Sequence, residues 1–323
     1  MSGGTAVSPE APIRIGISSC LLGERVRFDG GHKRDAFLVE TFGRYVDWVP
    51  VCPEVEVGLG VPRESLQLRR IAGQVRMVTT ETGIDHTEAM RRYSQRRVAA
   101  LAGADLCGYV LKKNSPSCGV ERVKIYGHAR PIASGRGLFA EALRQAFPHL
   151  PVEEEGRLNN PQLRENFIER VFAYRRLRAL FGARWTIGGL AAFHSAHKLQ
   201  LTAHSPRLYT ELGQLVTGAK ALPRPALRAS YEAQFMRTLA RTATTRRQVS
   251  VLQGTMKYFT SRLEPAALRQ LRGLVAEYGS GRLPPVVPLA LVRHYAQQFS
   301  VPQLQGQTYL EPDPQELMLR NHV

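Results

Sequence analysis

Strand-like and helix-like patterns of apolar residues alternate in the first half of the chain. Short apolar runs predict three strands, at residues 13–19, 48–52 and 106–112. Helical spacing is found at residues 36–45, 87–104 and 137–147. Alternation of this kind is typical of a mostly parallel sheet that is covered by helices. We therefore expect an α/β, Rossmann-like N-terminal domain.

The pattern changes at residues 151–161, where PVEEEGRLNNP is acidic and then rich in turn-forming residues. Beyond this segment nearly every stretch has helical spacing, which favours an all-α domain. The tail from Leu283 is interrupted by prolines and has one predicted helix, at residues 288–299. The expected organisation is a disordered lead-in at residues 1–12, an α/β domain at 13–155 and an all-α domain at 162–323.

The composition is that of a globular protein, with 43% hydrophobic and 22% charged residues in 323. No apolar run approaches the roughly 20 residues that a membrane span needs. The first twelve residues contain neither the basic nor the apolar segment of a secretory signal. We expect a cytoplasmic protein without membrane contact.

The formal net charge of +17 is concentrated in the second half of the chain. Residues 1–160 hold 22 lysines and arginines against 18 acidic residues, whereas residues 161–323 hold 22 against 9. Basic side chains that neutralise phosphates release condensed counterions, which drives binding to nucleic acids. The second half therefore favours a polyanionic partner, and a merely well-solvated surface is the alternative.

Three of the four cysteines fall at or just after the ends of predicted strands. Cys20 and Cys52 end strands, and Cys118 lies in the turn after a third strand. Disulfides are rare in a reducing compartment, which leaves metal binding, catalysis or core packing. Since the carboxyl ends of parallel strands meet at one edge, these three thiols should lie close together. Cys107 is inside the third strand, where a free cysteine is usually a buried small hydrophobe.

The surroundings of these cysteines favour a metal site. Cys118 ends the basic, hydroxyl-rich segment KKNSPSC, which should favour thiolate over thiol. Three thiolates suit an iron–sulfur cluster or zinc. Structural zinc normally takes four protein ligands, and His32 is the nearby candidate for a fourth. A four-iron cluster on three cysteines would instead leave one iron open to a soft atom such as sulfur.

Three motifs in order, ISSCLLGERVRFDGGHK, PVCPEVEVGLGVPRE and LKKNSPSCG, resemble the thiouracil desulfidase (TudS-like) family over roughly residues 13–155. In the second half, FHSAHKLQLTAHSPRLYTELGQLV and YLEPDPQELMLRNHV are similar to the YbgA-type domain. The pairing of the two domains resembles the fused desulfidases called RudS, which act on 4-thiouridine in transfer RNA.

The resemblance implies a [4Fe-4S] cluster on Cys20, Cys52 and Cys118, with one iron that has no protein ligand and captures the thiocarbonyl sulfur. It also implies that Glu54 and Ser115 are the catalytic pair. Exchange of C=S for C=O with water is redox-neutral, and neither a nicotinamide nor a flavin cofactor is expected. Glu54 would be the general base for the water, and Ser115 would relay a proton or orient the ring.

Basic clusters in the helical half are candidate contacts for the phosphates of transfer RNA. The candidate RNA-binding residues are Lys198, Arg237, Arg241, Arg246 and Arg247. A second cluster consists of Tyr174, Arg175, Arg176 and Arg178. For any single arginine, a solvated helix face is the alternative.

His194, His197 and His204 fall near one face of an expected helix. Metal binding, contact with RNA or the other domain, and structural packing all remain open. The sequence HxxHK lacks the glutamate of an HExxH zinc site, which counts against a metal. Ser117 and Asp29 are candidate supports of the active site rather than catalytic groups.

Two other functions are also compatible with the sequence. The chain could desulfurate free thiouracil-type bases and use its helical domain for dimerisation. It could also be a redox-sensing RNA-binding protein with a regulatory cluster, which would release no sulfide. A radical enzyme is not expected, because the chain has no CxxxCxxC run.

Overall fold

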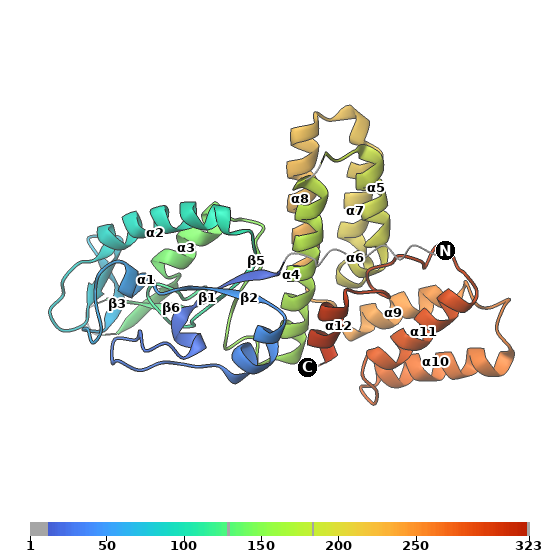
Figure 1. Ribbon diagram of the computed structural model, residues 1–323, viewed down its shortest axis with the longest axis horizontal. Helices are drawn as coiled ribbons and strands as arrows, with labels where there is room; N and C mark the ends of the chain where they lie inside the picture. The colour runs from blue at the N-terminus through green and yellow to red at the C-terminus, as the bar shows by residue number, and fades with distance from the viewer. Residues whose placement is uncertain (1–11, 128–129, 183, 322–323) are drawn as a thin grey trace, which may run out of the picture. The chain divides into compact units, whose positions relative to one another are not determined.

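The computed structural model describes residues 12–127, 130–182 and 184–321. Its contacts divide the chain into two compact units, the first ending at Phe167 and the second beginning at Ile168. As predicted, an α/β region with a parallel sheet comes first and a helix-rich region follows (Figure 1). Of the predicted lead-in at residues 1–12, all but Pro12 lies outside the described residues.

The first unit contains a four-stranded sheet in the order β2-β1-β5-β8. Its strands are β1 (Arg14–Ser18), β2 (Asp47–Val51), β5 (Leu106–Leu111) and β8 (Val152–Glu154). Every neighbouring pair is parallel, and the three predicted strands are all present. β5 is buried along its whole length, which explains why its sequence is continuously apolar instead of alternating.

The strand order creates a crevice between β1 and β5. From β1 the chain passes to β2 on one side, whereas from β5 it passes to β8 on the other side. Adjacent strands whose connections diverge in this way form a topological switch point, where ligands of open parallel sheets bind. The carboxyl ends of β1 and β5 are therefore the expected location of a site.

Helices cover the parallel sheet on both faces. α2 (Thr87–Leu101) and α3 (Leu138–Ala146) lie on one face (Figure 1). There Phe139 packs between Tyr93 of α2 and Tyr109 of β5, with ring centroids 6.4 and 6.0 Å away. The opposite face carries the helical turns η2 (Phe37–Thr41) and η3 (Phe42–Arg44), which replace the helix predicted at residues 36–45.

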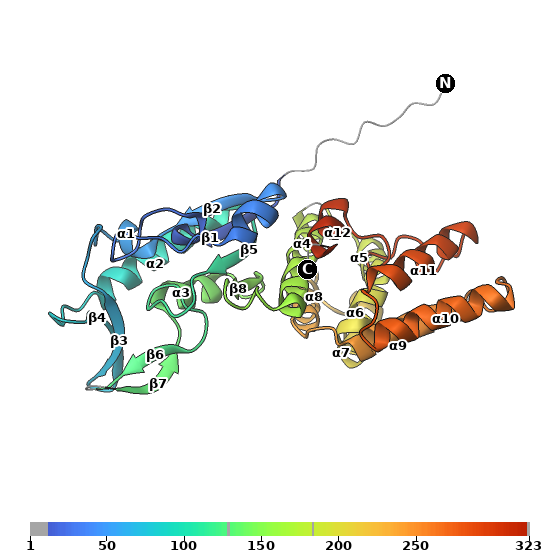
Figure 2. The same ribbon diagram turned by 90° about the horizontal axis from the view of Figure 1, so that it is seen from below.

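A second four-stranded sheet, in the order β4-β3-β6-β7, is missing from the sequence-based prediction (Figure 2). Its strands are β3 (Leu66–Ile71), β4 (Gln74–Thr79), β6 (Val123–Tyr126) and β7 (Pro131–Gly135). β3 and β4 form a hairpin, and its turn residues Ala72 and Gly73 have φ values of 47° and 78°. Positive φ at both positions is the requirement of a type I′ turn.

The second unit is helical and has two apolar clusters, with α6 contributing to both. Its helices are α4 (Pro161–Gly182, which starts in the first unit), α5 (Ile187–Ala196), α6 (Lys198–His204), α7 (Pro206–Thr217), α8 (Arg224–Leu239), α9 (Thr245–Met256), α10 (Pro265–Gly279), α11 (Val286–Gln298) and α12 (Pro314–Asn321). α12 is absent from the sequence-based prediction. Within the described ranges, no helix combines the length and the apolar character needed to cross a bilayer.

Candidate active site

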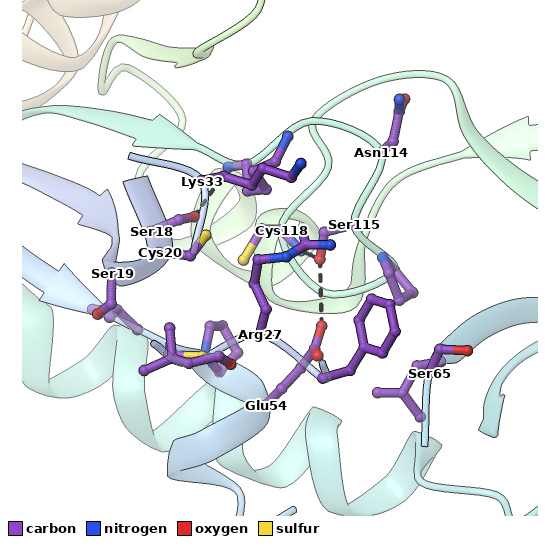
Figure 3. Close-up of a pocket in the computed structure, with 18 of the residues that line it drawn as sticks. Ser18, Ser19, Cys20, Arg27, Lys33, Glu54, Ser65, Asn114, Ser115 and Cys118 are labelled. Carbon is purple, nitrogen blue, oxygen red and sulfur yellow. Dashed lines mark hydrogen bonds between the residues drawn. The ribbon is translucent and has the colours of Figure 1, made fainter. Parts of the chain in front are cut away.

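A pocket of about 340 Å³ lies at the carboxyl ends of β1, β2 and β5 (Figure 3). The predicted ligands and the predicted catalytic pair all line it: Cys20, Cys52, Cys118, Glu54 and Ser115. They lie far apart in sequence and meet only because the three strands are parallel neighbours. Cys107 is buried within β5 and is not among the lining residues.

Backbone contacts hold the first two cysteines. Cys20 lies in the helical turn η1 (Ser19–Leu22), and its carbonyl accepts the amide of Lys33 at 2.9 Å. Cys52 precedes the short helix α1 (Pro53–Glu56), and its amide donates to Oε1 of Glu56 at 3.1 Å. The two loops are also linked, since Cys52 Sγ lies 3.8 Å from the carbonyl oxygen of Val26.

The loop of Cys118 is attached to the start of α3. The carbonyl of Ser117 accepts the Phe139 amide at 3.0 Å, which satisfies a free donor at the helix N-terminus. A side chain on Gly137 would place its Cβ 2.4 Å from the carbonyl carbon of Ser117, so this close approach requires glycine. Within the loop, the Cys118 amide donates to Ser115 Oγ at 3.1 Å.

Three thiols from three different loops line this one pocket, and thiolate sulfurs are the usual ligands of an iron–sulfur cluster. Among the described residues, no three histidine, cysteine or carboxylate side chains converge closely enough to share one metal ion. Thiolates that bind different irons of a cluster do not have to converge on one point. His32 is exposed and does not line the pocket, which leaves the zinc interpretation without its fourth ligand.

The expectation that the Cys118 loop favours thiolate is wrong for the metal-free protein. Burial raises the pKa of Cys118 well above its usual value, and the nearby Glu54 charge adds to this. Burial and the neighbouring Cys52 raise the pKa of Cys20 to about 11, although Lys112 partly offsets the shift. Burial also raises the pKa of Cys52. Desolvation therefore outweighs the hydrogen bond between Ser18 and Cys118, and at Cys20 it outweighs the charges of Lys112 and Arg27.

Both carboxylate oxygens of Glu54 are engaged. Arg63 donates to Oε2 from Nη2 at 2.6 Å and from Nε at 3.2 Å. On the other oxygen, Ser117 Oγ donates to Oε1 at 2.8 Å. Ser115 Oγ donates to the same atom at 3.4 Å (Figure 3). The side chain of Glu54 is 16% exposed. The structure thus brings the predicted catalytic pair into contact, and it places Ser117 closer to Glu54 than Ser115.

Arg63 is a site residue that the sequence reasoning missed. Its side chain is 7% exposed, and besides Glu54 it donates to the carbonyls of Gly60 (2.8 Å) and Val26 (3.0 Å). Arg63 belongs to VPRE, which is part of the same motif as PVCPE, so the motif could have suggested it as a site residue. Its neighbours in the chain do not indicate that it pairs with Glu54. A guanidinium with four such contacts holds its carboxylate in one orientation.

The predicted RNA-binding residues differ in solvent exposure and in the contacts that they make. Lys198, Arg237, Arg241 and Arg246 are exposed. Arg247 is half-buried and donates to the carbonyls of His204 (3.0 Å) and Thr242 (3.3 Å), so it also ties α9 to α6.

The second predicted basic cluster is partly structural. Arg176 forms an ion pair with the buried Glu316 of α12, with Nη1 and Oε2 2.8 Å apart. Its Nε donates to Nε2 of His197 at 3.2 Å. Arg176 therefore holds helices together and is a poor candidate for a phosphate contact.

The structure supports the packing interpretation of the three histidines. The expected helix is divided at His197 into α5 and α6, and all three imidazoles are buried. His204 contacts the Arg241 carbonyl with Nδ1 and Glu169 with Nε2. His194 stacks on Tyr209 with ring centroids 5.2 Å apart.

From the burial of His197 we predict that the helical unit becomes less stable in acid. It is 1% exposed, and burial together with the Arg176 charge lowers its pKa from 6.5 to about 3. The unfolded chain binds a proton at this residue below pH ~6.5, whereas the folded protein does not. The free energy of unfolding should therefore fall by about 2 kcal/mol between pH 7 and pH 5 through this group. We expect H197Q to be less stable at pH 7 and to lack this contribution.

Urea unfolding at the two pH values measures the effect. Trp185 packs on Phe181 in the helical unit (ring centroids 5.1 Å apart), so its fluorescence reports this unit in a W48F background. Other titratable groups, including the buried Glu316, contribute equally to the pH dependence of wild type and of H197Q. If the free energies of unfolding of wild type and H197Q differed by the same amount at pH 7 and pH 5, the prediction would be contradicted.

Two sequence families match different parts of the chain. The family described as 2-thiouracil desulfurase matches residues 15–155, which contain the cysteines and Glu54. The family described as a protein of unknown function, DUF1722, matches residues 198–314 of the helical unit.

Individual relatives each correspond to about half of this chain. The uncharacterized protein YbgA of Escherichia coli (strain K12) is 28% identical over 165 residues, which are 51% of this chain and 98% of YbgA. The uncharacterized protein YbbK of Bacillus subtilis (strain 168) is 29% identical over 147 residues, or 43% of this chain and 95% of YbbK. A solved structure described as a [4Fe-4S]-dependent thiouracil desulfidase, TudS, is 30% identical, covers 46% of this chain and 93% of its own, and has a TM-score of 0.38.

Proposed function

Because the chain belongs, through residues 15–155, to the 2-thiouracil desulfurase family, we propose that it is an iron–sulfur desulfidase that acts on 4-thiouridine in transfer RNA. The reaction exchanges C=S for C=O: water forms the new C–O bond, the C–S bond breaks, and sulfide leaves with the protons of the water. No electrons are gained or lost. The observation that carries the proposal is the pocket in which three cysteines meet Glu54 and Ser115.

Cys20, Cys52 and Cys118 would hold a [4Fe-4S] cluster, the cofactor named in the description of the TudS structure. Such a cluster would supply an iron without a protein ligand, which could accept the sulfur. The positive charges of Lys112 and Arg27 are close enough to lower the pKa of Cys20, so they also offset the negative charge of thiolate ligands.

Glu54 would take a proton from the attacking water. Arg63 holds Oε2, which leaves Oε1 facing the two serine hydroxyls. A base fixed in this way accepts the proton without first having to be oriented. Ser115 Oγ would orient the ring or relay a proton to it, because it lies between the Cys118 amide and Glu54.

The charge of the helical half supports a transfer RNA substrate over a free base. Residues 161–323 hold 22 basic against 9 acidic residues, and four of the five candidate RNA-binding side chains are exposed. Such contacts position a nucleic acid through its phosphates without reading its sequence.

The decisive experiment is anaerobic reconstitution with iron and sulfide, followed by incubation with transfer RNA that contains 4-thiouridine. We expect the near-ultraviolet absorbance of the thiolated base to disappear while an equal amount of sulfide is released. Turnover of free thiouracil alone, without binding of transfer RNA, would favour the free-base enzyme. Binding of RNA without sulfide release would favour the redox-sensing protein.

Charge reversal on the helical unit should weaken RNA binding and spare the chemistry. The triple variant R237E/R241E/R246E removes exposed cations near the end of α8 and the start of α9. We expect its affinity for transfer RNA to fall by about tenfold or more at moderate salt, because counterion release is lost. Filter binding across a salt series measures this, and the salt dependence should become weaker.

The matched control carries the same change of charge elsewhere on the helical unit. R269E/R272E/R282E changes three exposed arginines on and after α10. Both triple variants should turn over free thiouracil at the wild-type rate, because no substituted residue lines the pocket. Equal loss of RNA binding in both would show that net charge, and not the predicted patch, controls affinity.

A further inference from the structure

The residues from Val26 to Gly31 form a hydrogen-bonded turn, and the first three of them line the pocket. The Gly30 amide donates to the Arg27 carbonyl at 3.0 Å, and the Arg27 amide donates to the Gly31 carbonyl at 3.2 Å. Asp29 Oδ1 accepts the Gly31 amide at 3.0 Å, which closes the turn. The sequence suggested Asp29 as a support of the active site. In the structure Asp29 is exposed and stabilises this turn through that hydrogen bond.

The same turn is tied to the residue that orients Glu54. The Arg63 amide donates to the Phe28 carbonyl at 2.9 Å, and Arg63 Nη2 donates to the Val26 carbonyl at 3.0 Å. Since Arg63 also holds Oε2 of Glu54, the turn and the carboxylate have a fixed spacing. A group held by the turn would thus be held at a defined position relative to Glu54.

The two side chains at the tip of the turn, Arg27 and Phe28, both line the pocket. Phe28 is 39% exposed, and the Arg27 guanidinium carbon lies over its ring at 5.4 Å from the centroid, so part of the ring is covered by Arg27 and part is open to a ligand. The Arg27 side chain is 23% exposed and extends across the pocket in Figure 3. Its Nε lies 3.4 Å from the exposed Asp29, a weak ion pair that leaves donors of the guanidinium for another acceptor.

We propose that Arg27 and Phe28 recognise the flat ring of a thiolated pyrimidine. Phe28 offers a face on which the ring stacks, and Arg27 donates hydrogen bonds to the exocyclic oxygen that the ring retains. Unpaired bases in RNA are commonly bound in this way, by aromatic rings and arginine planes. The sulfur is then left to the end of the pocket that holds the cysteines and Glu54.

This inference rests on the proposed function and adds the residues that select its substrate. It also requires that a base in transfer RNA leaves its stack before it enters the pocket, as for other enzymes that act on bases. The rival role for Arg27 is a phosphate contact, which would affect an RNA substrate but not a free base.

The test compares F28L, F28Y and R27M with R25M. Arg25 is exposed, belongs to the same loop and does not line the pocket, so R25M is the control for R27M. For free thiouracil we expect F28L and R27M to raise KM by about tenfold, with kcat within about twofold of wild type. F28Y keeps the aromatic face and should raise KM by less than F28L does. The absorption of the bound cluster should be unchanged in F28L, F28Y and R25M. Because Arg27 also offsets charge at Cys20, R27M is compared with wild type at equal cluster content.

Calorimetric binding of uracil and uridine provides a readout that needs no turnover. Uracil and uridine both lack phosphate. F28L and R27M should therefore raise the Kd of each by the same factor by which they raise the KM for thiouracil. Unchanged KM and unchanged uracil binding would overturn the inference while the proposed function stands. An effect of R27M on transfer RNA alone would also overturn it, in favour of the phosphate contact. Failure of the wild type to release sulfide would overturn the proposed function, and uracil binding would still decide the role of Arg27 and Phe28.

Discussion

Replacement of Cys118 by alanine is expected to abolish desulfuration, whereas the same replacement at Cys107 should leave the activity close to that of wild type. Both cysteines are buried and 11 positions apart, but only Cys118 lines the pocket. With Cys118 removed, two thiols remain, and they cannot hold a four-iron cluster as three do. Cys107 lies within β5, so C107A removes the packing of a small side chain and the contact of its Sγ with the Asp105 carbonyl at 3.8 Å, both away from the pocket.

Iron and sulfide content after anaerobic reconstitution, together with the absorption of the cluster, are the direct measurements. C118A should bind substantially less iron than wild type, and C107A should bind the same amount. Circular dichroism of both variants checks that the fold is kept. Full cluster content in C118A would show that this cysteine is not a ligand, and loss of the cluster in C107A would point to a different set of ligands.

The substitution E54Q should remove turnover while the cluster remains. Glutamine has nearly the same shape as glutamate and keeps an oxygen for Arg63 or the serines, but it cannot accept a proton from water. A general base contributes about 10²–10⁴-fold to a rate, and a decrease in kcat of that size is expected. The affinity for uracil should change little, because ring recognition is assigned to Arg27 and Phe28.

Single-turnover sulfide release, normalised to cluster content, separates this effect from loss of metal. E40Q serves as the control, because Glu40 is exposed and pairs with Arg34 away from the pocket. A normal rate of sulfide release in E54Q would exclude Glu54 as the base. A lower rate that is fully explained by lower cluster content would instead make Glu54 a residue that supports the cysteines.

Much of the fold is determined by local pattern. β1, β2 and β5 follow from short apolar runs, because a strand buried in a parallel sheet has no polar face to interrupt it. The β3–β4 hairpin could also have been found, since LQLRRI and QVRMVT alternate on either side of a two-residue turn. The division of one predicted helix at His197 is harder to foresee, because no proline or glycine marks the break.

The sequence by itself predicted which residues gather at one place: Cys20, Cys52 and Cys118 from their positions at or after predicted strands, and Glu54 and Ser115 from the family resemblance. All five line one pocket. This succeeds because parallel strands bring their carboxyl ends to one edge whatever lies between them in the chain.

Only the tertiary structure decided how these residues are held and charged. The pairing of Arg63 with Glu54 joins different loops, and no local pattern specifies such a contact. The raised pKa values of the thiols likewise reverse the expectation from the lysine-rich motif. Burial depends on everything that packs around a group, whereas the sequence shows only its neighbours in the chain.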